Sequence, residues 1–203
     1  MKIDQPKKRI ILVGGGGHCK AVIDVIEQTG IYEIAGILDK KEKIGEKVLG
    51  YSVIGTDDEI PHFAKDGYYF LVTIGHIKSP QIRIKIFEQI EKYTHNLATI
   101  ISPLAYVSPN AEIGKGTIIM HHALVNAGAN VGKNCIINTK ALVEHDTTIE
   151  DHCHISTSAI INGGTVVKKG TFFGSNAVSK EYVKTNEFDF IKAGNIFKGY
   201  KNG

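Results

Sequence analysis

A strict six-residue repeat runs through the second half of the chain without an insertion. From residue 101 to residue 178, thirteen consecutive units each open with a bulky apolar residue and carry a small residue four positions later. The opening residues are Ile101, Val107, Ile113, Ile119, Val125, Val131, Ile137, Val143, Ile149, Ile155, Ile161, Val167 and Phe173. Strands alternate with a period of two and helices with a period near 3.6, so a period of six predicts a parallel β-helix of short strands and turns.

The remaining positions of the repeat predict how the walls of this β-helix are built. The large residue is expected to fill the interior and the small residue to fit where the wall bends. Several second positions carry glycine or asparagine, namely Gly114, Asn126, Gly132, Asn138, Asn162 and Gly174. These residue types tolerate a positive φ best, so we expect left-handed backbone at the second position.

Composition restricts the classes of protein to which the chain can belong. The sequence is 42% hydrophobic and 22% charged, which is ordinary for a soluble globular protein. No apolar run approaches the ~20 residues that span a bilayer, and the first six residues do not resemble a signal peptide. We therefore expect a cytoplasmic protein without a membrane partner. A net charge of +3 is too small to indicate nucleic-acid binding.

The first half of the chain predicts a small α/β domain over residues 1–97. A buried strand at residues 9–13 is followed by the glycine run 14–17, by His18 and by an apolar helical pattern from residue 21. Amide groups at such a helix start can bind phosphate. A second strand, residues 34–38, ends at Asp39, where an open α/β sheet places a residue that reads the nucleotide. A third strand at 68–74 and a helix at 80–93 complete the domain.

The glycine run alone does not identify a phosphate site. No Lys-Ser/Thr pair follows it, so it is not a P-loop. A tight turn that lets the strand and the helix pack closely would need the same glycines, and this alternative stays open.

A polar cluster changes the character of the repeat between residues 138 and 164. Acyl transfer from a thioester needs one base near neutrality, and histidine is the side chain tuned for that task. A flanking carboxylate holds the imidazole in one tautomer and stabilises the imidazolium that forms. The contiguous residues Glu144, His145 and Asp146 supply this arrangement.

Other uses of the polar residues have to be weighed. Zinc could bind His145, Asp146, His152 and His154, but side chains at a strand and a corner point to different faces, so we expect no metal site. Cys19 beside His18 could form an acyl-enzyme, although direct transfer needs only the base. The pair His121 and His122 is expected to be polar surface or subunit interface. The three cysteines argue against a disulfide framework, and Cys135 and Cys153 fall on inward positions.

Taken together, the glycine loop ending in His18, the α/β domain and the hexads resemble the sialic acid O-acetyltransferase and bacillosamine N-acetyltransferase family of hexapeptide-repeat acyltransferases. Further matches lie at residues 37–40, 48–55 and 72–75, and at Arg83. The resemblance implies a left-handed β-helix over residues 98–182 and a C-terminal tail, residues 183–203, that covers the coenzyme. It also implies acetyl-CoA as co-substrate, no metal, and a homotrimer with its active site between subunits.

The resemblance implies roles for individual residues. His145 would be the general base, Asp146 and Glu144 would flank it, and Asn138 would lie near the reacting centre. The expected substrate contacts are Gly16, Gly17 and His18 at the pyrophosphate or sugar, Asp39 and Lys40 at the base and ribose, and Gly75 where the substrate approaches closely. The expected acetyl-CoA contacts are His154, Gly163, Gly174, Ser175 and Gly194. Ile196 and Phe197 depart from the closing segment of the family.

We therefore predict an acetyl-CoA-dependent N-acetyltransferase acting on a nucleotide-linked amino sugar by direct attack on the thioester. O-acetylation of sialic acid or another sugar is the alternative within the class. A nucleotide-sugar-binding scaffold without catalysis is the alternative outside it. The homotrimer is also expected because apolar outward residues, such as Ile118, Leu124, Ile136 and Leu142, would be buried between copies.

Overall fold

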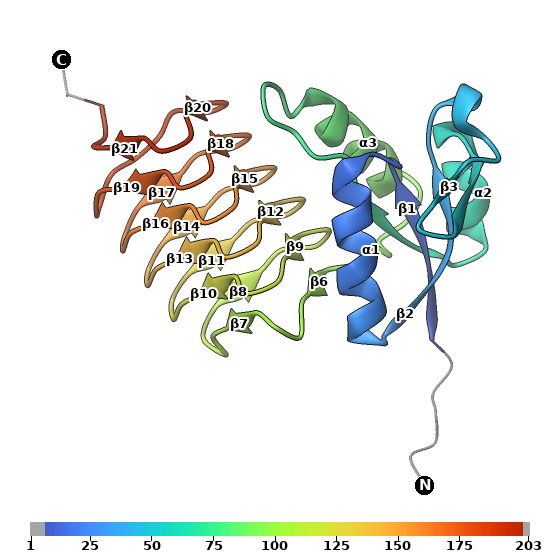
Figure 1. Cartoon of the computed structure of the whole chain (residues 1–203), viewed down its shortest axis with the longest axis horizontal. Coiled ribbons are helices and arrows are strands. Elements are labelled where there is room, and N and C mark those ends of the chain that lie inside the picture. The colour runs from blue at the N-terminus through green and yellow to red at the C-terminus, as the bar shows by residue number, and fades with distance from the viewer. Residues whose placement is uncertain (1–6, 201–203) are drawn as a thin grey trace, which may run out of the picture.

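The computed structural model describes residues 7–200, which fold into an α/β domain followed by a β-helix (Figure 1). The outermost residues of the predicted first domain and of the predicted tail, 1–6 and 201–203, lie outside this range. Helix α1 (Gly17–Thr29) lies between the sheet of the first domain and the coils of the β-helix.

The first domain is built on a five-stranded sheet in the order β3-β4-β2-β1-β5. The strands are β1 (Lys8–Val13), β2 (Tyr32–Leu38), β3 (Lys47–Val48), β4 (Tyr51–Gly55) and β5 (Tyr69–Val72). All neighbours are parallel except β3, which pairs antiparallel with β4. The unbroken apolar run in β1 is typical of a strand covered on both faces. The three strands predicted from the sequence are thus confirmed, as are the helices predicted from residue 21 and at 80–93, which correspond to α1 and to α3 (Gln81–Glu91).

Helices cover both faces of this sheet. Helix α1 packs on one face, and α2 (Ile60–Lys65) and α3 (Gln81–Glu91) pack on the other. Two short 3₁₀ turns, η1 (Lys41–Lys43) and η2 (Asp57–Glu59), follow β2 and β4. Both turns therefore lie at the carboxyl edge of the sheet, where open α/β sheets bind ligands.

The second part is a left-handed parallel β-helix made of two-residue strands. They are β6 (Ile100–Ile101), β7 (Tyr106–Val107), β8 (Glu112–Ile113), β9 (Ile118–Ile119), β10 (Leu124–Val125), β11 (Asn130–Val131), β12 (Ile136–Ile137), β13 (Leu142–Val143), β14 (Thr148–Ile149), β15 (His154–Ile155), β16 (Ile160–Ile161), β17 (Val166–Val167), β18 (Phe172–Phe173), β19 (Val178–Ser179), β20 (Phe190–Ile191) and β21 (Ile196–Phe197). Partners in neighbouring coils are 18 residues apart, as are Ile118, Ile136 and His154.

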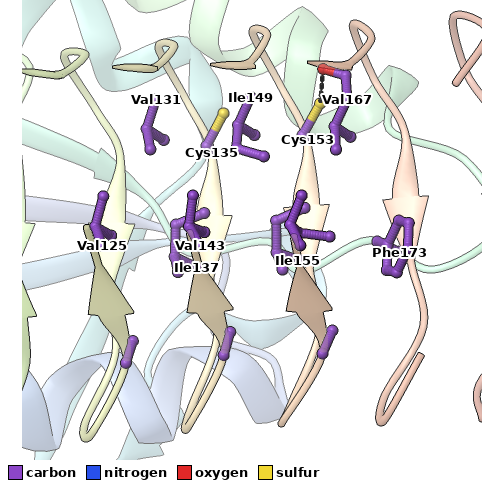
Figure 2. Packing of buried hydrophobic residues seen from close by; sticks show 14 of the residues in the cluster. Val125, Val131, Cys135, Ile137, Val143, Ile149, Cys153, Ile155, Val167 and Phe173 are labelled. Carbon is purple, nitrogen blue, oxygen red and sulfur yellow. Dashed lines mark hydrogen bonds between the residues drawn. The ribbon is translucent and has the colours of Figure 1, made fainter. Parts of the chain in front are cut away.

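Three parallel sheets form the faces of the prism. The first face is β6-β9-β12-β15-β18-β20, the second is β7-β10-β13-β16-β19-β21, and the third is β8-β11-β14-β17. From Val107 to Phe173, the opening residue of each hexad points into the prism and stacks on its equivalents in the next coils (Figure 2). Ile101, in the first coil, is 39% exposed. Cys135 and Cys153 are buried among them, and burial raises the pKa of Cys153 well above its usual range. The predicted interior is confirmed.

The predicted place of left-handed backbone is wrong. Positive φ occurs at the fourth position of the hexads, for example in Lys140 (φ 59°) and Asp146 (φ 57°), and not at the second. The second-position glycines allow the coils to stack closely instead. A Cβ on Gly114 would lie 2.5 Å from the carbonyl carbon of Gly132, and one on Gly174 would lie 2.5 Å from the amide nitrogen of Ala193.

The β-helix also continues past residue 182, where the sequence analysis ended it. Strands β20 and β21 pair with β18 and β19, so residues 183–200 form further coil and not a separate tail. The opening positions Ser179 and Thr185 are polar, which hid the repeat in the sequence. Both are buried, and their hydroxyl oxygens accept hydrogen bonds from the backbone N–H groups of Asn162 and Lys168, each at 2.8 Å.

The three faces differ in what covers them. On the first face, Ile118 and Ile136 are fully buried beneath α1 of the same chain, so the expectation that they meet another copy is wrong. The outward residues of the second face are apolar and not covered by the first domain; they are Tyr106, Leu124, Leu142, Ile160, Val178 and Ile196. The third face carries the polar outward residues Glu112, Asn130 and Thr148, followed by Val166.

Candidate functional site

The predicted base lies at the corner that joins the second face to the third. The Nδ1 atom of His145 is 2.9 Å from Oδ2 of Asp146. Oε2 of Glu144 accepts hydrogen bonds from the backbone N–H of His145 at 3.2 Å and from Nδ2 of Asn126 at 2.9 Å. The turn is closed by Asp146 in the left-handed conformation, which aspartate tolerates better than most residues. The corner therefore fixes both carboxylates around the imidazole.

These contacts determine what the His145 ring can do. An ionised carboxylate only accepts hydrogen bonds, so Nδ1 donates to Asp146 and Nε2 keeps its lone pair. The hydrogen bond to Asp146 raises the pKa of His145, and the charges of Asp146 and Glu144 act in the same direction. The side chain is exposed. The arrangement is that of a general base whose Nε2 is open to a substrate proton.

Gly163 lies against this ring, one coil further along the chain. A Cβ on Gly163 would lie 2.8 Å from both Cε1 and Nε2 of His145, too close for the ring to keep its position. The resemblance assigned Gly163 to acetyl-CoA, and the structure adds this packing against the base. This contact could have been predicted from the sequence, because Gly163 follows His145 by 18 residues and residues 18 apart occupy equivalent places in neighbouring coils.

A second polar cluster lies where the first domain meets the first face. Nδ1 of His154 donates to the backbone carbonyl of His76 at 2.7 Å, and Nε2 faces Nδ2 of Asn138 at 3.2 Å. The rings of His76 and His18 lie with their centroids 5.4 Å and 6.5 Å from that of His154. The carbonyl contact makes Nδ1 the protonated nitrogen, so Nε2 of neutral His154 is an acceptor. No role for His76 was predicted from the sequence, although it follows β5 as His18 follows β1.

Burial and a nearby guanidinium keep these histidines neutral. Burial, together with the charge of Arg83, lowers the pKa of His154 to about 4 and of His18 and His76 to about 3. Arg83 is itself buried; Nη1 donates to the carbonyls of Val72 and Ile74 and Nε to that of Asn134. Arg83 thus connects the end of β5 to the β-helix as well as setting the local charge.

The two clusters do not meet within one chain. Residues 138–141 form the corner between the first and second faces, and residues 144–147 form the corner between the second and third. The structure therefore places Asn138 with His18 and His154, and leaves His145 across the second face. Ser175 and Gly174 lie on the corner that carries Asn138, where Oγ of Ser175 is 2.9 Å from Oγ of Ser156.

A cleft opens at the carboxyl ends of the parallel strands of the first domain. Its volume is about 740 Å³, and Gly14, Leu38, Gly55 and Ile74 line it at the strand ends. Gly16 and Gly17 are exposed beside it at the start of α1, with no atom within 4 Å of the places where their Cβ atoms would be. Gly75 does not border this cleft and faces His18 instead. A Cβ on Gly75 would lie 3.3 Å from the Cβ of His18.

Asp39 lies in the cleft but is already engaged. Its Oδ2 accepts hydrogen bonds from the N–H of Gly15 at 2.7 Å and from Nζ of Lys43 at 2.9 Å, and Oδ1 accepts from the N–H of Lys40 at 2.8 Å. Burial works to raise the pKa of Asp39, but these hydrogen bonds outweigh it and lower the pKa overall. Asp39 therefore holds the glycine loop in place. Lys40 lines the cleft as expected for a substrate contact.

The last coil offers a separate surface near the expected coenzyme contacts. A shallow cleft of about 450 Å³ is lined by apolar, amide and basic residues, among them Phe190, Lys192, Asn195, Ile196 and Lys198. Gly194, predicted at the coenzyme, occupies the turn of this coil with φ 68°.

The other chemistries considered from the sequence find little support in the residues that the structure describes. Between residues 7 and 200, no group of three or more His, Cys, Asp or Glu side chains is arranged to hold a metal ion. Burial raises the pKa of Cys19 to about 11, which disfavours the thiolate that an acyl-enzyme would need. His121 bridges Asp24 of α1 (2.8 Å) and Ser102 (2.7 Å), so it is an interdomain contact.

No helix within residues 7–200 has both the length and the apolar character that crossing a membrane requires.

Known proteins resemble both parts of the chain. Residues 9–90 match the PglD N-terminal domain. UDP-N-acetylbacillosamine N-acetyltransferase of Bacillus subtilis (strain 168) is 32% identical over 114 residues, which cover 55% of this chain and 51% of that protein. An uncharacterised protein of Acanthamoeba polyphaga mimivirus is 34% identical over 119 residues, 22% of its length. The chain thus spans about half, or less, of the curated relatives it matches.

Solved structures match nearly the whole chain. The acetyltransferase domain of PglB from Neisseria gonorrhoeae FA1090, in complex with acetyl coenzyme A, is 28% identical with a TM-score of 0.86, over 95% of this chain and 93% of that one. PerB from Caulobacter crescentus, in complex with CoA and GDP-perosamine, is 26% identical with a TM-score of 0.64, over 92% of each chain. Both parts of the fold, in the same order, are thus shared with acetyltransferases. Over nearly its whole length the chain is thus similar to acetyltransferases, in agreement with the resemblance of its sequence to the sialic acid O-acetyltransferase and bacillosamine N-acetyltransferase family.

Proposed function

We propose that the protein transfers the acetyl group of acetyl-CoA to the amine of a nucleotide-linked amino sugar. The observation that carries this proposal is the His145–Asp146 pair, at 2.9 Å, with the His145 side chain 54% exposed. The names of the similar proteins, which include a UDP-N-acetylbacillosamine N-acetyltransferase and a GDP-perosamine complex, support the same class of acceptor.

The reaction needs one proton acceptor at the right time. The amine lone pair attacks the thioester carbonyl carbon, and a C–N bond forms as Nε2 of His145 removes a proton from the nitrogen. The tetrahedral intermediate then collapses, the C–S bond breaks, and the departing CoA thiolate takes the proton from the imidazolium. Asp146 stabilises that imidazolium through its hydrogen bond to Nδ1, and Glu144 adds a second negative charge nearby.

The first domain supplies the binding site for the nucleotide in this proposal. The exposed Gly16 and Gly17 at the start of α1 present amide groups to the pyrophosphate, and the helix dipole favours its negative charge. Lys40 and the 740 Å³ cleft accept the nucleoside. The neutral His18 and His154, with Asn138, face the sugar end.

We further propose that the active site is shared between subunits of a homotrimer. His145 and the His18–His154 cluster lie on different corners of one coil, so a neighbouring copy has to bring them together. The apolar outward residues of the second face are the surface this assembly would bury, because Leu124 and Leu142 are otherwise part-exposed. Light scattering at micromolar concentration should give three times the chain mass. A monomer that retains full activity would contradict the shared site.

The pH dependence of the rate gives a test of the base. Asp146 raises the pKa of His145, so Asp146→Asn should lower that pKa and move the acidic limb of the kcat profile to lower pH. The direction follows because the rate is lost as pH falls through the pKa of the base, when Nε2 becomes protonated. We expect kcat on the plateau to fall by about tenfold, since the imidazolium loses its stabilising charge. An acidic limb unchanged by the substitution would show that Asp146 does not act on the base.

A further inference from the structure

Three carboxylates besides Asp39 line the cleft of the first domain, those of Asp57, Asp58 and Glu59, and Asp57 is the least exposed of the three. Asp57, at the start of η2, lines the cleft together with Asp39 and Lys40. Its backbone carbonyl accepts a hydrogen bond from Nε2 of Gln89 at 3.1 Å, and Thr56 caps the turn. No hydrogen bond to the Asp57 carboxylate occurs among residues 7–200, whereas three reach that of Asp39. The turn is therefore held in place, while the Asp57 carboxylate stays available to a ligand.

The surroundings of the Asp57 carboxylate favour a hydrogen-bond donor from a ligand. Partial burial, and repulsion by Asp58 and then by Asp39, raise the pKa of Asp57, and Lys85 offsets this only in part. A half-buried carboxylate without partners is costly, and a bound N–H or O–H group would relieve that cost.

The strand order places Asp57 at the base end of a bound nucleotide. Going outward, β1 ends at the glycine loop, β2 ends at Asp39, and β4 is followed by Asp57. Neighbouring strands are about 4.8 Å apart, so Asp57 lies roughly 10 Å from the loop across the sheet edge. A nucleoside diphosphate whose pyrophosphate contacts Gly16 and Gly17 would bring its ribose to the end of β2 and its base to the end of β4.

Apolar side chains border the same part of the cleft. Ile44, Ile54 and Ile82 line it and are 50%, 40% and 67% exposed. Isoleucines around a cleft offer an apolar surface against which the face of a nucleobase can pack. The base would then present its polar edge to the carboxylate.

We propose that the Asp57 carboxylate accepts a hydrogen bond from the ring N–H of the nucleobase and so determines which nucleotide-linked sugar the protein binds. The inference rests on the proposed function. Uracil, thymine and guanine carry a ring N–H on this edge. Adenine and cytosine carry a ring nitrogen with a lone pair there, which an ionised carboxylate repels. A contact between Asp57 and the ring nitrogen therefore selects uridine, thymidine or guanosine diphosphate groups over adenosine and cytidine ones.

Calorimetric titration with free nucleoside diphosphates tests this assignment. Wild type should bind at least one of UDP, TDP and GDP ten- to hundredfold more tightly than ADP and CDP. Asp57→Asn should weaken the tightest of these by about ten- to hundredfold, the usual range for a hydrogen bond to a charged group. Asp66→Asn is the matched control, because Asp66 is an exposed aspartate outside the cleft. It should leave the affinity unchanged.

Methylation of the base separates recognition from a structural effect. The tightest ligand is compared with its form methylated at the ring nitrogen. The methyl group should weaken binding to wild type but have little effect on Asp57→Asn. Methylation and the substitution remove the same hydrogen bond, that between the ring N–H and the Asp57 carboxylate. Equal affinity of wild type and Asp57→Asn for the unmethylated ligand would overturn the proposal, as would an equal methylation effect in both. Wild type that bound none of the five nucleotides would instead contradict the proposed nucleotide-linked acceptor.

Discussion

Replacing His145 by alanine is expected to lower kcat by about 10²–10⁴-fold, the usual contribution of a general base. The exposed ring has its Nδ1 hydrogen bonded to Asp146, so the substitution removes the group that we propose takes the proton from the acceptor amine. Steady-state kinetics should show the loss in kcat, with the KM for acetyl-CoA nearly unchanged because no binding contact is assigned to the ring. Urea unfolding should be unaffected, since the side chain is exposed.

A matched histidine substitution controls for nonspecific effects. His62 is an exposed histidine next to a carboxylate, Asp66, at 3.7 Å, but it lies on α2 of the first domain. The variant His62→Ala should keep full activity. An active His145→Ala enzyme with an unchanged pH profile would contradict the assignment. His18 would then be the next candidate, although burial keeps its pKa near 3 and makes it a weak base.

Substitution of Gly163 by alanine is expected to lower kcat by about 10²-fold without removing any catalytic group. The new methyl group would lie 2.8 Å from Cε1 and Nε2 of His145, so the ring has to move away. A displacement of about 1 Å in a reacting group can cost a factor of this size. Stability should change little, because Gly163 does not have a positive φ and the exposed ring is free to swing.

A double substitution distinguishes displacement of the base from damage to coenzyme binding. In a His145→Ala background, Gly163→Ala has no ring to displace, so the residual kcat should not fall further. The effects of the two substitutions on kcat should therefore not add: the double variant should have nearly the same kcat as His145→Ala alone. A further hundredfold loss in the double variant, or a rise in the KM for acetyl-CoA in the single one, would place the role of Gly163 at the coenzyme instead.

The repeat made most of the fold predictable. A strict period of six predicted a parallel β-helix and its interior residues directly, whereas its left hand came from the family resemblance. The end of the β-helix did not, because Ser179 and Thr185 are polar and satisfy their hydroxyl groups through backbone contacts that a hydrophobic pattern cannot show. The predicted position of left-handed backbone was wrong. Glycine permits either a positive φ or a close approach between backbones, and Gly114 and Gly174 serve the close stacking of the coils.

The contacts around the proposed base were predictable because its partners are adjacent in sequence. Glu144, His145 and Asp146 form one corner, so their order already implies their contacts. The contacts of Asp39 and His76 depend on residues from other elements, and no local pattern reports them. For the same reason Ile118 and Ile136 looked like subunit interface, whereas α1 of the same chain covers them.

The most direct test of the account is acetyl transfer to a matched pair of acceptors. The purified protein is incubated with acetyl-CoA and either a nucleotide-linked amino sugar or the same compound with a hydroxyl in place of the amine. Free CoA thiol and the acetylated product are measured together, by a thiol reagent and by mass spectrometry. We expect one CoA released per N-acetylated product with the amino sugar, almost none with the hydroxyl compound, and almost none when His145 is alanine. Thiol release at the same rate with no acceptor, or transfer only to the hydroxyl compound, would contradict it.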